Sequence, residues 1–329
     1  MQRRKLSVIL ALVLLVLFLM PATAFASGQE EEFPARPITI ICPWAAGGGT
    51  DRTARFIAEQ LSDVLGTPVN VTNQTGGNGA VGHSAAANAD PDGYTLGNVT
   101  FEVAALEYLG YSDVTPDDYT AIMQFNQDPA AVIVRADSEW DTVDDLLEDI
   151  RQEPAGTYTF AGSGTASVWD LARVGMLNSV GIDPNKVKYI PTKGAAPAIT
   201  EMLGGEVDVL TSSYPEAAPQ IEAGGLKALG VMAEDRVSVY EDVPTLTEQG
   251  VDWVYGTWRG FTVPEGTPEE RVQILQDALM QVVESEEFEE FMANNQFGIK
   301  IREGEEFMDF MMNTYEELEE IIEVAGYGE

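Results

Sequence analysis

Residues 38–52 read Ile-Thr-Ile-Ile-Cys-Pro-Trp-Ala-Ala-Gly-Gly-Gly-Thr-Asp-Arg, and an apolar helical stripe continues from there to Leu65. A strand-like run therefore meets a glycine-rich turn, and that turn opens a helix. The first N–H groups of a helix have no partner within it, and the helix dipole is positive at that end. Such a turn suits an anion. The stretch predicts a strand, an anion-binding turn and a helix, in that order.

Strand and helix patterns alternate along the rest of the chain. Helical stripes are expected over 80–89, 143–150, 168–175 and 195–203, with a short helix near 245–249 and a helical tail from residue 272 onward. Repeated β-α-β units imply a mostly parallel sheet covered on both faces. The expected strands are 38–42, 69–73, 94–99, 130–135, 158–161, 187–190, 207–210, 226–231 and 258–263.

Two loops with small residues stand at equivalent places in this pattern. The first covers residues 43–51 and the second residues 162–167, and each follows a strand and precedes a helix. A chain of roughly 300 residues favours two compact lobes over a single core. If the lobes face each other, two helix N-termini converge on one cleft beyond the strand ends, where open α/β sheets bind ligands.

The N-terminus has the pattern of a secretory signal peptide. Arg3, Arg4 and Lys5 precede the apolar residues 6–20, and Ala24-Phe25-Ala26 is a small-x-small cleavage site. The apolar run is shorter than the ~20 residues that a spanning helix needs, which favours cleavage over an uncleaved anchor. The sequence therefore predicts a signal peptide over 1–26, a spacer over 27–32 and a periplasmic or otherwise extracytoplasmic protein.

The chain is strongly acidic. Removing residues 1–26 takes away three basic residues and no acidic one, so the formal net charge goes from −36 to −39. Nucleic acids and anionic membrane surfaces are therefore poor partners. With one cysteine and one histidine, neither a disulfide within the chain nor a zinc site of the usual His/Cys type is expected. No metal or other cofactor is predicted.

Neither loop matches a nucleotide-binding motif, and the first contains no lysine. A phosphate normally recruits cations, whereas a carboxylate held by backbone N–H groups, hydroxyls and water needs fewer. Asp51 is expected either to cap its helix or to orient such a water. In the second loop, the hydroxyls of Ser163, Thr165 and Ser167 would bind the ligand; the alternative is a polar turn with Ser167 as N-cap.

Other polar residues at strand ends are weaker candidates. Lys193, before Gly194, would supply one mobile cation to the cleft or else lie in solvent. Asp208 and Ser212 are expected to follow a strand and reach the same cleft. Trp44 would wall the pocket or serve packing.

Catalytic chemistry is not favoured. Ser163 has glycines at −1 and +1 instead of the −2 and +2 positions of a nucleophile elbow. His83, the single histidine, has no evident partner, so a buried and satisfied or a solvent-facing role is expected.

Motifs along the mature chain resemble those of the Bug or TctC family, the extracytoplasmic solute receptors of tripartite tricarboxylate transporters. They are Phe-Pro-Ala-Arg-Pro-Ile (33–38), Pro-Trp-Ala-Ala-Gly-Gly-Gly-Thr-Asp-Arg-Thr-Ala-Arg (43–55), Asn-Gln-Thr-Gly-Gly-Asn-Gly (73–79), Pro-Asp-Gly-Tyr-Thr-Leu (91–96), Gly-Ser-Gly-Thr-Ala-Ser (162–167), Lys-Gly-Ala-Ala-Pro-Ala (193–198), Gly-Gly-Glu-Val-Asp (204–208), Asp-Val-Pro-Thr-Leu-Thr-Glu-Gln-Gly (242–250) and Val-Pro-Glu-Gly-Thr-Pro (263–268). Each motif alone is weak, but their order and spacing together are specific.

The resemblance implies a two-lobed periplasmic-binding-protein fold of type II, a Venus flytrap with crossing strands, mixed and mostly parallel sheets and a cleft between the lobes. Lobe 1 would comprise 33–132 plus 256–329, and lobe 2 would comprise 133–255. The implied partners of this monomeric receptor are a small organic acid and membrane permease subunits. The alternatives are a sensor subunit that signals occupancy and an extracytoplasmic enzyme acting on a carboxylate.

The resemblance also implies a ligand carboxylate held by the two loops, partly through ordered water and without an arginine from those loops. Thr192, Trp169 and the pair Gly97-Asn98 depart from the family pattern and affect the choice of ligand. The predicted ligand-binding residues are Trp44, Ala45, Gly48, Gly49, Thr50, Asp51, Thr100, Ser163, Gly164, Thr165, Ser167, Lys193, Gly194, Asp208 and Ser212.

Overall fold

The computed structural model describes residues 33–324 and residue 327. The predicted signal peptide (1–26) and spacer (27–32) lie outside the described residues. The described residues from Arg36 onward form one compact unit, and the fold below is that of this unit.

The first lobe is built on a mixed sheet. Strand β1 pairs in parallel with β2 and β3, while β9 pairs antiparallel with both β3 and β4, which gives the order β2-β1-β3-β9-β4. The short β10 pairs antiparallel with β4. The bounds are β1 (Ile38–Cys42), α2 (Gly49–Leu65), β2 (Val69–Asn73), α3 (Ala80–Ala87), β3 (Thr95–Thr100), η1 (Phe101–Ala104), η2 (Pro116–Asp118), β9 (Gly256–Pro264), α8 (Glu269–Val283), α9 (Glu286–Asn294), β10 (Ile299–Glu303) and α10 (Gly304–Val324).

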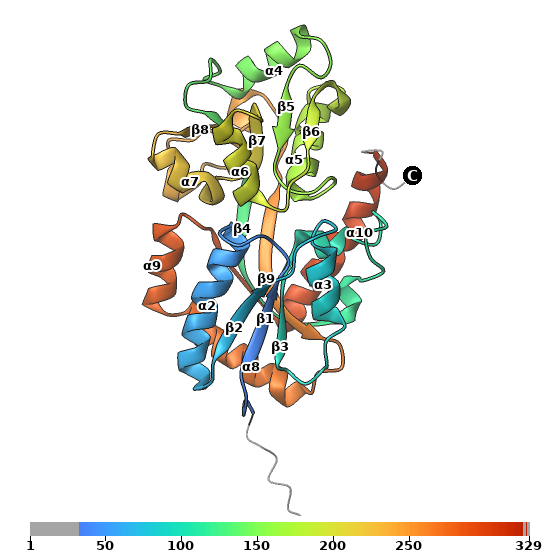
Figure 1. Ribbon diagram of the computed structural model, residues 1–329, viewed down its shortest axis with the longest axis vertical. Helices are drawn as coiled ribbons and strands as arrows, with labels where there is room; N and C mark the ends of the chain where they lie inside the picture. The colour runs from blue at the N-terminus through green and yellow to red at the C-terminus, as the bar shows by residue number, and fades with distance from the viewer. Residues whose placement is uncertain (1–32, 325–326, 328–329) are drawn as a thin grey trace, which may run out of the picture. The chain divides into compact units, whose positions relative to one another are not determined.

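The second lobe repeats the strand–turn–helix theme. Here β5 pairs in parallel with β6 and β7, and β4 pairs antiparallel with β7 and β8. Figure 1 shows this lobe above the first one, with the long strands β4 and β9 running between them. The bounds are β4 (Tyr119–Arg135), α4 (Val143–Gln152), β5 (Thr159–Ala161), α5 (Val168–Ser179), η3 (Pro184–Lys186), β6 (Lys188–Ile190), α6 (Ala195–Gly204), β7 (Val209–Ser213), α7 (Tyr214–Glu222), β8 (Leu226–Val231), η4 (Ser238–Tyr240) and η5 (Thr247–Gln249).

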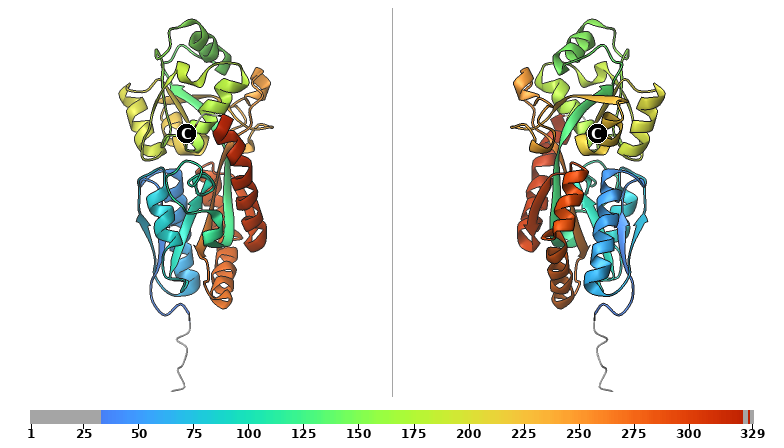
Figure 2. Two further views of the ribbon diagram at one scale, coloured as in Figure 1. Left: turned by 90° about the vertical axis from the view of Figure 1, so that its right-hand side faces the viewer. Right: turned by 90° about the vertical axis from the view of Figure 1, so that its left-hand side faces the viewer.

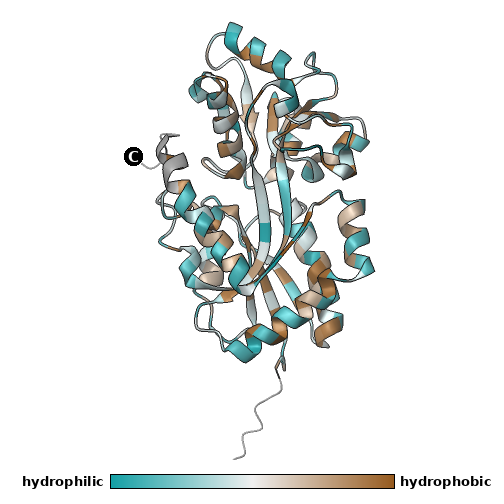
Figure 3. Ribbon diagram, turned by 180° about the vertical axis from the view of Figure 1, so that it is seen from behind, coloured by the Kyte–Doolittle hydropathy of each residue, from teal (hydrophilic) through white to brown (hydrophobic). Residues whose placement is uncertain are grey.

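Strand β4 joins the two sheets, and the sequence pattern predicted only its second half, residues 130–135. Residues Tyr119–Pro129 pair with β9, whereas Ala130–Arg135 pair with β7 and β8. The missed half contains Gln124, Asn126 and Asp128, which break the apolar pattern of a buried strand. All three side chains are buried, and each accepts a hydrogen bond from an arginine. Arg302 donates to Gln124, and Arg259 donates to Asn126 and Asp128. Figure 3 shows the crossing strands from behind.

The C-terminal region is only partly the helical tail that the sequence predicts. Helices α8, α9 and α10 form, but β10 interrupts them because Ile299–Glu303 adds to the edge of β4. Helix α10 packs along the first-lobe half of β4, as both views in Figure 2 show. Within the part of the chain that the structure describes, no helix has the length and apolar character to span a bilayer.

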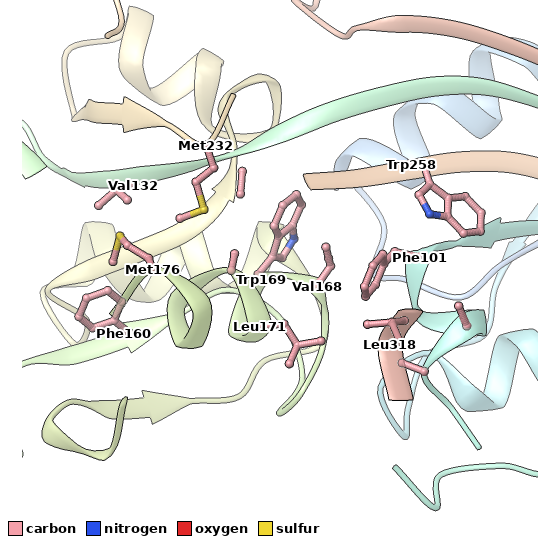
Figure 4. Close-up of a cluster of buried hydrophobic side chains, with 14 of the residues drawn as sticks. Phe101, Val132, Phe160, Val168, Trp169, Leu171, Met176, Met232, Trp258 and Leu318 are labelled. Atoms are coloured by element: carbon pink, nitrogen blue, oxygen red, sulfur yellow. The ribbon is translucent and has the colours of Figure 1, made fainter. Parts of the chain in front are cut away.

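One apolar cluster extends through both lobes. It contains Phe101 and Trp258 from the first lobe and Val168 and Trp169 from the second, all nearly buried (Figure 4). A separate cluster lies under α6 and α7. Because the first cluster includes the first residues of α5, packing fixes where that helix begins.

Candidate functional site

The first predicted turn connects β1 to α2. Gly48 is the extended N-cap residue and Gly49 is the first helical residue. A Cβ on Gly49 would lie 2.8 Å from Nη2 of Arg259 and 2.9 Å from Oε1 of Glu216. Two charged side chains thus approach the backbone at a place where only glycine leaves room for them.

Asp51 braces this turn from behind and does not line the cavity described below. Its carboxylate accepts hydrogen bonds from the Gly47 N–H at 2.9 Å and from Asn73 Nδ2 at 2.8 Å. Arg55 forms an ion pair with it at 2.8 Å. Burial opposes ionisation, but these partners together hold the pKa of Asp51 below its usual value. No N-cap bond from its side chain forms, so Asp51 orders the turn instead of capping α2.

The second predicted turn connects β5 to α5. The buried Ser163 hydroxyl is hydrogen-bonded to the Ser167 hydroxyl, so Ser167 occupies the N-cap position without capping by its side chain. Ala166 adopts a left-handed φ of 56°, and its N–H donates to Asp170 at 2.8 Å. Thr165 is exposed. The turn therefore directs Ser163 inward and Thr165 outward.

A third helix begins at the same place. Gly194 is the N-cap residue of α6 with a φ of 135°, a region that favours glycine. The Ala45 N–H donates to the Lys193 carbonyl at 3.4 Å, which links the two lobes. The Lys193 side chain is exposed.

These three turns surround a small cavity of about 20 Å³. The first residues of α2, α5 and α6 all contribute to its wall, so three positive helix ends face it. The space is enough for about one water molecule. The lining residues are Trp44, Ala45, Gly48, Gly49, Thr50, Thr100, Glu102, Ser163, Val168, Trp169, Gly194, Ala195, Glu216, Thr257 and Arg259.

Glu216 reaches from the second lobe to the start of α2 in the first lobe. It stands in the first turn of α7, and its Oε1 accepts from the Gly49 N–H at 3.2 Å. The same oxygen lies 3.3 Å from Nη2 of Arg259. Its other oxygen accepts from the Ser212 hydroxyl at 2.7 Å. This carboxylate is therefore held by a helix N-terminus, a cation and a hydroxyl.

Arg259 on β9 is the guanidinium of the site, with 1% of its surface exposed. It pairs with Asp128 at 2.7 Å and donates through Nε to the Thr50 hydroxyl at 3.1 Å. It also donates to Asn126. The loops contain no arginine, but β9 supplies one across the sheet.

Glu102 makes the reverse contact between the lobes, because it comes from the first lobe and reaches the start of α5 in the second. It lies in η1 of the first lobe, is 1% exposed, and accepts from the N–H of Val168, the first residue of α5, at 3.2 Å. Its other oxygen accepts from the Thr100 hydroxyl at 2.6 Å. That hydroxyl is in turn 3.1 Å from Trp44 Nε1 and 3.3 Å from His83 Nε2. Burial raises the pKa of Glu102 above its ordinary value.

His83 is part of this network and is unsuited to general-base catalysis. Its ring is 1% exposed, and burial lowers its pKa to about 3. It is therefore neutral at physiological pH, in agreement with the expected buried and satisfied role.

The predicted residues separate into four groups: those that line the cavity, those behind it, those that are exposed, and Asp208. Asp51, Gly164, Ser167 and Ser212 stand behind the lining, and Thr165 and Lys193 are exposed. Asp208 is a correction: it precedes β7, and its carboxylate accepts from Thr159 at the start of β5, so it lies at the wrong end of the strands. The predicted residues that line the cavity are Trp44, Ala45, Gly48, Gly49, Thr50, Thr100, Ser163 and Gly194.

Sequence reasoning missed the three charged lining residues, Glu102, Glu216 and Arg259. Helix α7 was not predicted because Pro215 and Pro219 obscure its pattern, so Glu216 could not be placed at a helix start. Glu102 follows the predicted residue Thr100 by two positions, and that proximity was the one usable signal. In so acidic a chain, a single glutamate carries little information.

Comparisons with known proteins agree with this architecture. The model of the family described as "Tripartite tricarboxylate transporter family receptor" (TctC) matches residues 53–327. An Agrobacterium vitis protein, described as the UPF0065 protein in the TAR-I ttuE-ttuC' intergenic region, is 33% identical over 81% of this chain and 76% of its own length.

Two solved structures resemble the chain closely. The periplasmic binding protein BugD is 27% identical, with a TM-score of 0.84, and the match covers 90% of this chain and 99% of that one. The R. palustris protein Rpa4515, solved with adipate, is 25% identical, with the same TM-score and the same coverage. The fold is therefore that of two-lobed periplasmic binding proteins, and this chain belongs to the TctC family of tripartite tricarboxylate transporter receptors.

Proposed function

We propose that this protein is an extracytoplasmic receptor that captures a small carboxylate-bearing metabolite and passes it to the permease subunits of a tripartite transporter. The observation that carries the proposal is the convergence of three helix N-termini on one cavity. Two of these ends already hold carboxylates, since the Gly49 N–H binds Glu216 and the Val168 N–H binds Glu102. The adipate in the R. palustris relative is a solute of the same chemical class.

The residues proposed to contact the solute are those that line the cavity. Backbone N–H groups at the starts of the helices and the hydroxyls of Thr50 and Ser163 would replace the water around a carboxylate. Each neutral hydrogen bond contributes roughly 0.5–1.5 kcal/mol net, so several are needed for useful affinity. Asp51, Ser167 and Ser212 are proposed to support these groups from behind.

Capture is proposed to involve lobe closure about the crossing strands. Residues 33–132 plus 256–329 would move as one body and 133–255 as the other. Strand β4 changes partners at Ala130, and a Cβ on Gly256 would lie 2.3 Å from the Asp128 carbonyl oxygen, so the strands are tightly packed there. Because the closed cavity has room for about one water, a larger solute requires the lobes to separate before it binds.

Export of the chain is part of the proposal, with cleavage after Ala26 and a periplasmic mature protein. N-terminal sequencing of the protein from a producing cell should give Ser27 as the first residue. A first residue of Met1 would contradict cleavage.

Matched solutes test the receptor function. Adipate should raise the melting temperature of the purified protein because a ligand that binds the native state stabilises it, whereas adipamide, which has the same skeleton without charge, should not. A wider set of organic acids and their amides extends the test beyond one chain length. If no acid exceeds its amide, the proposal is wrong. Mass spectrometry of the recovered solute separates a receptor from an enzyme, since a receptor returns it unchanged.

A further inference from the structure

We infer that Tyr327 is a positioning residue for the second turn, residues 162–167, and that its hydroxyl holds the two lobes together in the closed form. The inference rests on the proposed receptor function and adds to it a side chain that does not line the cavity. Its basis is a set of hydrogen bonds that connects the residue just beyond α10 with the start of α5 in the second lobe.

Tyr327 is attached to the first lobe through α10. That helix packs against η1, η2 and β10 and against β4. Its residues Phe307, Met311 and Ile322 are buried in the large apolar cluster. The Tyr327 N–H donates to the Ile322 carbonyl at 3.0 Å, and the tyrosine ring packs against the same cluster. Figure 1 shows α10 rising along the first lobe toward the second, so Tyr327 moves with the first lobe.

The Tyr327 hydroxyl reaches a buried ion pair in the second lobe. It donates to Oδ2 of Asp170 at 2.9 Å, and Nη2 of Arg173 donates to it at 3.4 Å. Both partners belong to α5, and their side chains pair at 2.6 Å with 0% and 4% of their surfaces exposed. Hydrogen bonds to ionised groups are stronger than those between neutral groups, so this contact favours the closed arrangement of the lobes.

Asp170 connects this contact to the second turn. The same oxygen, Oδ2, accepts from the Ala166 N–H at 2.8 Å. Ala166 has a left-handed φ of 56°, a conformation in which the Cβ of a residue other than glycine is crowded. The turn therefore depends on the bond to Asp170 to keep this conformation, and Tyr327 fixes the oxygen that accepts it.

A second set of contacts connects the same ion pair to the cavity. The Arg173 guanidinium lies over the Tyr189 ring, 5.2 Å from its centre. The Tyr189 hydroxyl accepts from the Ser163 N–H at 3.0 Å and donates to the Ser163 carbonyl at 3.2 Å. Ser163 in turn lines the cavity. Both ends of the turn are thus tied to Asp170 and Arg173, the two residues that Tyr327 contacts.

Separation of the lobes would break the Tyr327 contacts and leave the others intact. Asp170, Arg173, Ala166 and Tyr189 all belong to the second lobe, so a rigid movement of that lobe preserves the bonds among them. The Tyr327 hydroxyl therefore stabilises the closed form alone. Because a solute leaves after the lobes open, loss of this hydroxyl should speed release and change capture by the open form little.

Hydrogen exchange tests the positioning role without any solute. Tyr327→Phe removes only the hydroxyl, and the amides of residues 163–168 should then exchange about tenfold faster than in the parent protein. Tyr315→Phe is the matched control, because this second hydroxyl on α10 donates to Glu107 within the first lobe. The control should leave exchange in the segment unchanged. No gain in Tyr327→Phe, or an equal gain in both variants, would overturn the inference.

Rate constants for a solute test the effect on capture. They are measured by stopped flow with adipate or, if another acid of the set binds more tightly, with that acid. Tyr327→Phe should release the solute about tenfold faster than the parent protein, with an association rate constant changed by less than about twofold, whereas Tyr315→Phe should match the parent in both. An unchanged dissociation rate constant, or a loss confined to association, would overturn the inference. If no acid of the set binds the parent protein, the receptor function fails, and the exchange measurement alone decides the role of Tyr327.

Discussion

The starts of α2 and α5 look alike in sequence but differ in their electrostatics. Each follows a small-residue turn, and each receives a glutamate from the opposite lobe. The glutamate at α2 is matched by Arg259 at 3.3 Å, whereas the glutamate at α5 receives only neutral donors. A helix N-terminus thus attracts a carboxylate in both lobes, but a nearby cation decides whether that carboxylate is compensated.

Replacing Arg259 should have the largest effect on the free energy of unfolding. It should also leave the glutamates at the starts of both α2 and α5 without a cation. Arg259→Met leaves the buried carboxylates of Asp128 and Glu216 without their cation, and breaking a buried ion pair in this way costs about 3–5 kcal/mol. Urea denaturation measures the loss. Arg236→Met, which removes the half-exposed pair with Glu248, should cost no more than about 1 kcal/mol. Losses of equal size would contradict the assigned role of Arg259.

Crowding the α2 start should come next. In Gly49→Ala, the new methyl group meets Arg259 at 2.8 Å and Glu216 at 2.9 Å, so both must shift. We expect at least a tenfold loss of solute affinity, which corresponds to about 1.4 kcal/mol. Gly204→Ala on α6 is the control, because its Cβ would meet nothing within 4 Å. Unaltered binding by Gly49→Ala would show that the α2 start does not contact the solute.

Neutralising Glu102 and neutralising Glu216 should shift the stability of the fold in opposite directions. Glu102→Gln removes an uncompensated buried charge and should raise the melting temperature at pH 8 by a few degrees. Glu216→Gln removes a partner of Arg259 and should lower it. Thermal melts of both variants beside the parent protein make the measurement. Shifts of the same sign would remove the distinction between the two helix starts.

The pH dependence of the Glu102 effect has a defined sign. Burial raises the pKa of Glu102 in the folded protein, so the folded state holds this proton more firmly than the unfolded state does. Stability is therefore lost as pH rises from the ordinary glutamate value through the folded value. Arg259 weakly favours the ionised form, and His83 is neutral there. The advantage of Glu102→Gln should shrink as pH falls from the raised folded value toward the ordinary glutamate value of 4.5, and a constant advantage would contradict this cause.

The smallest effect is expected at Lys193, which the sequence suggested as a mobile cation for the cleft. Its side chain is exposed, whereas its carbonyl contacts Ala45. Lys193→Ala should therefore change solute affinity by less than about twofold, since exposed charges contribute little. A tenfold loss in calorimetry would mean that this lysine bends into the site when solute is present.

Much of the fold could be predicted from local pattern. The strands 38–42, 69–73 and 226–231 match β1, β2 and β8 residue for residue, and the helix over 195–203 differs from α6 by one residue. Prediction failed where polar residues were buried. The first half of β4 was missed because Asn126 and Asp128 are tolerable only beside Arg259, which lies more than 130 residues away.

The sequence by itself determined most of the order of strands and helices, with β10, α7 and the first half of β4 as the exceptions, together with the two small-residue turns and the family. These follow from side-chain periodicity and glycine conformation, which act over a few neighbouring residues. The tertiary structure alone decided which charges meet at those turns. Gly49 and Glu216 are 167 positions apart, and Glu102 and Val168 are 66 apart. Electrostatic partners are set by distance in space after the lobes pack, and no local pattern encodes that distance.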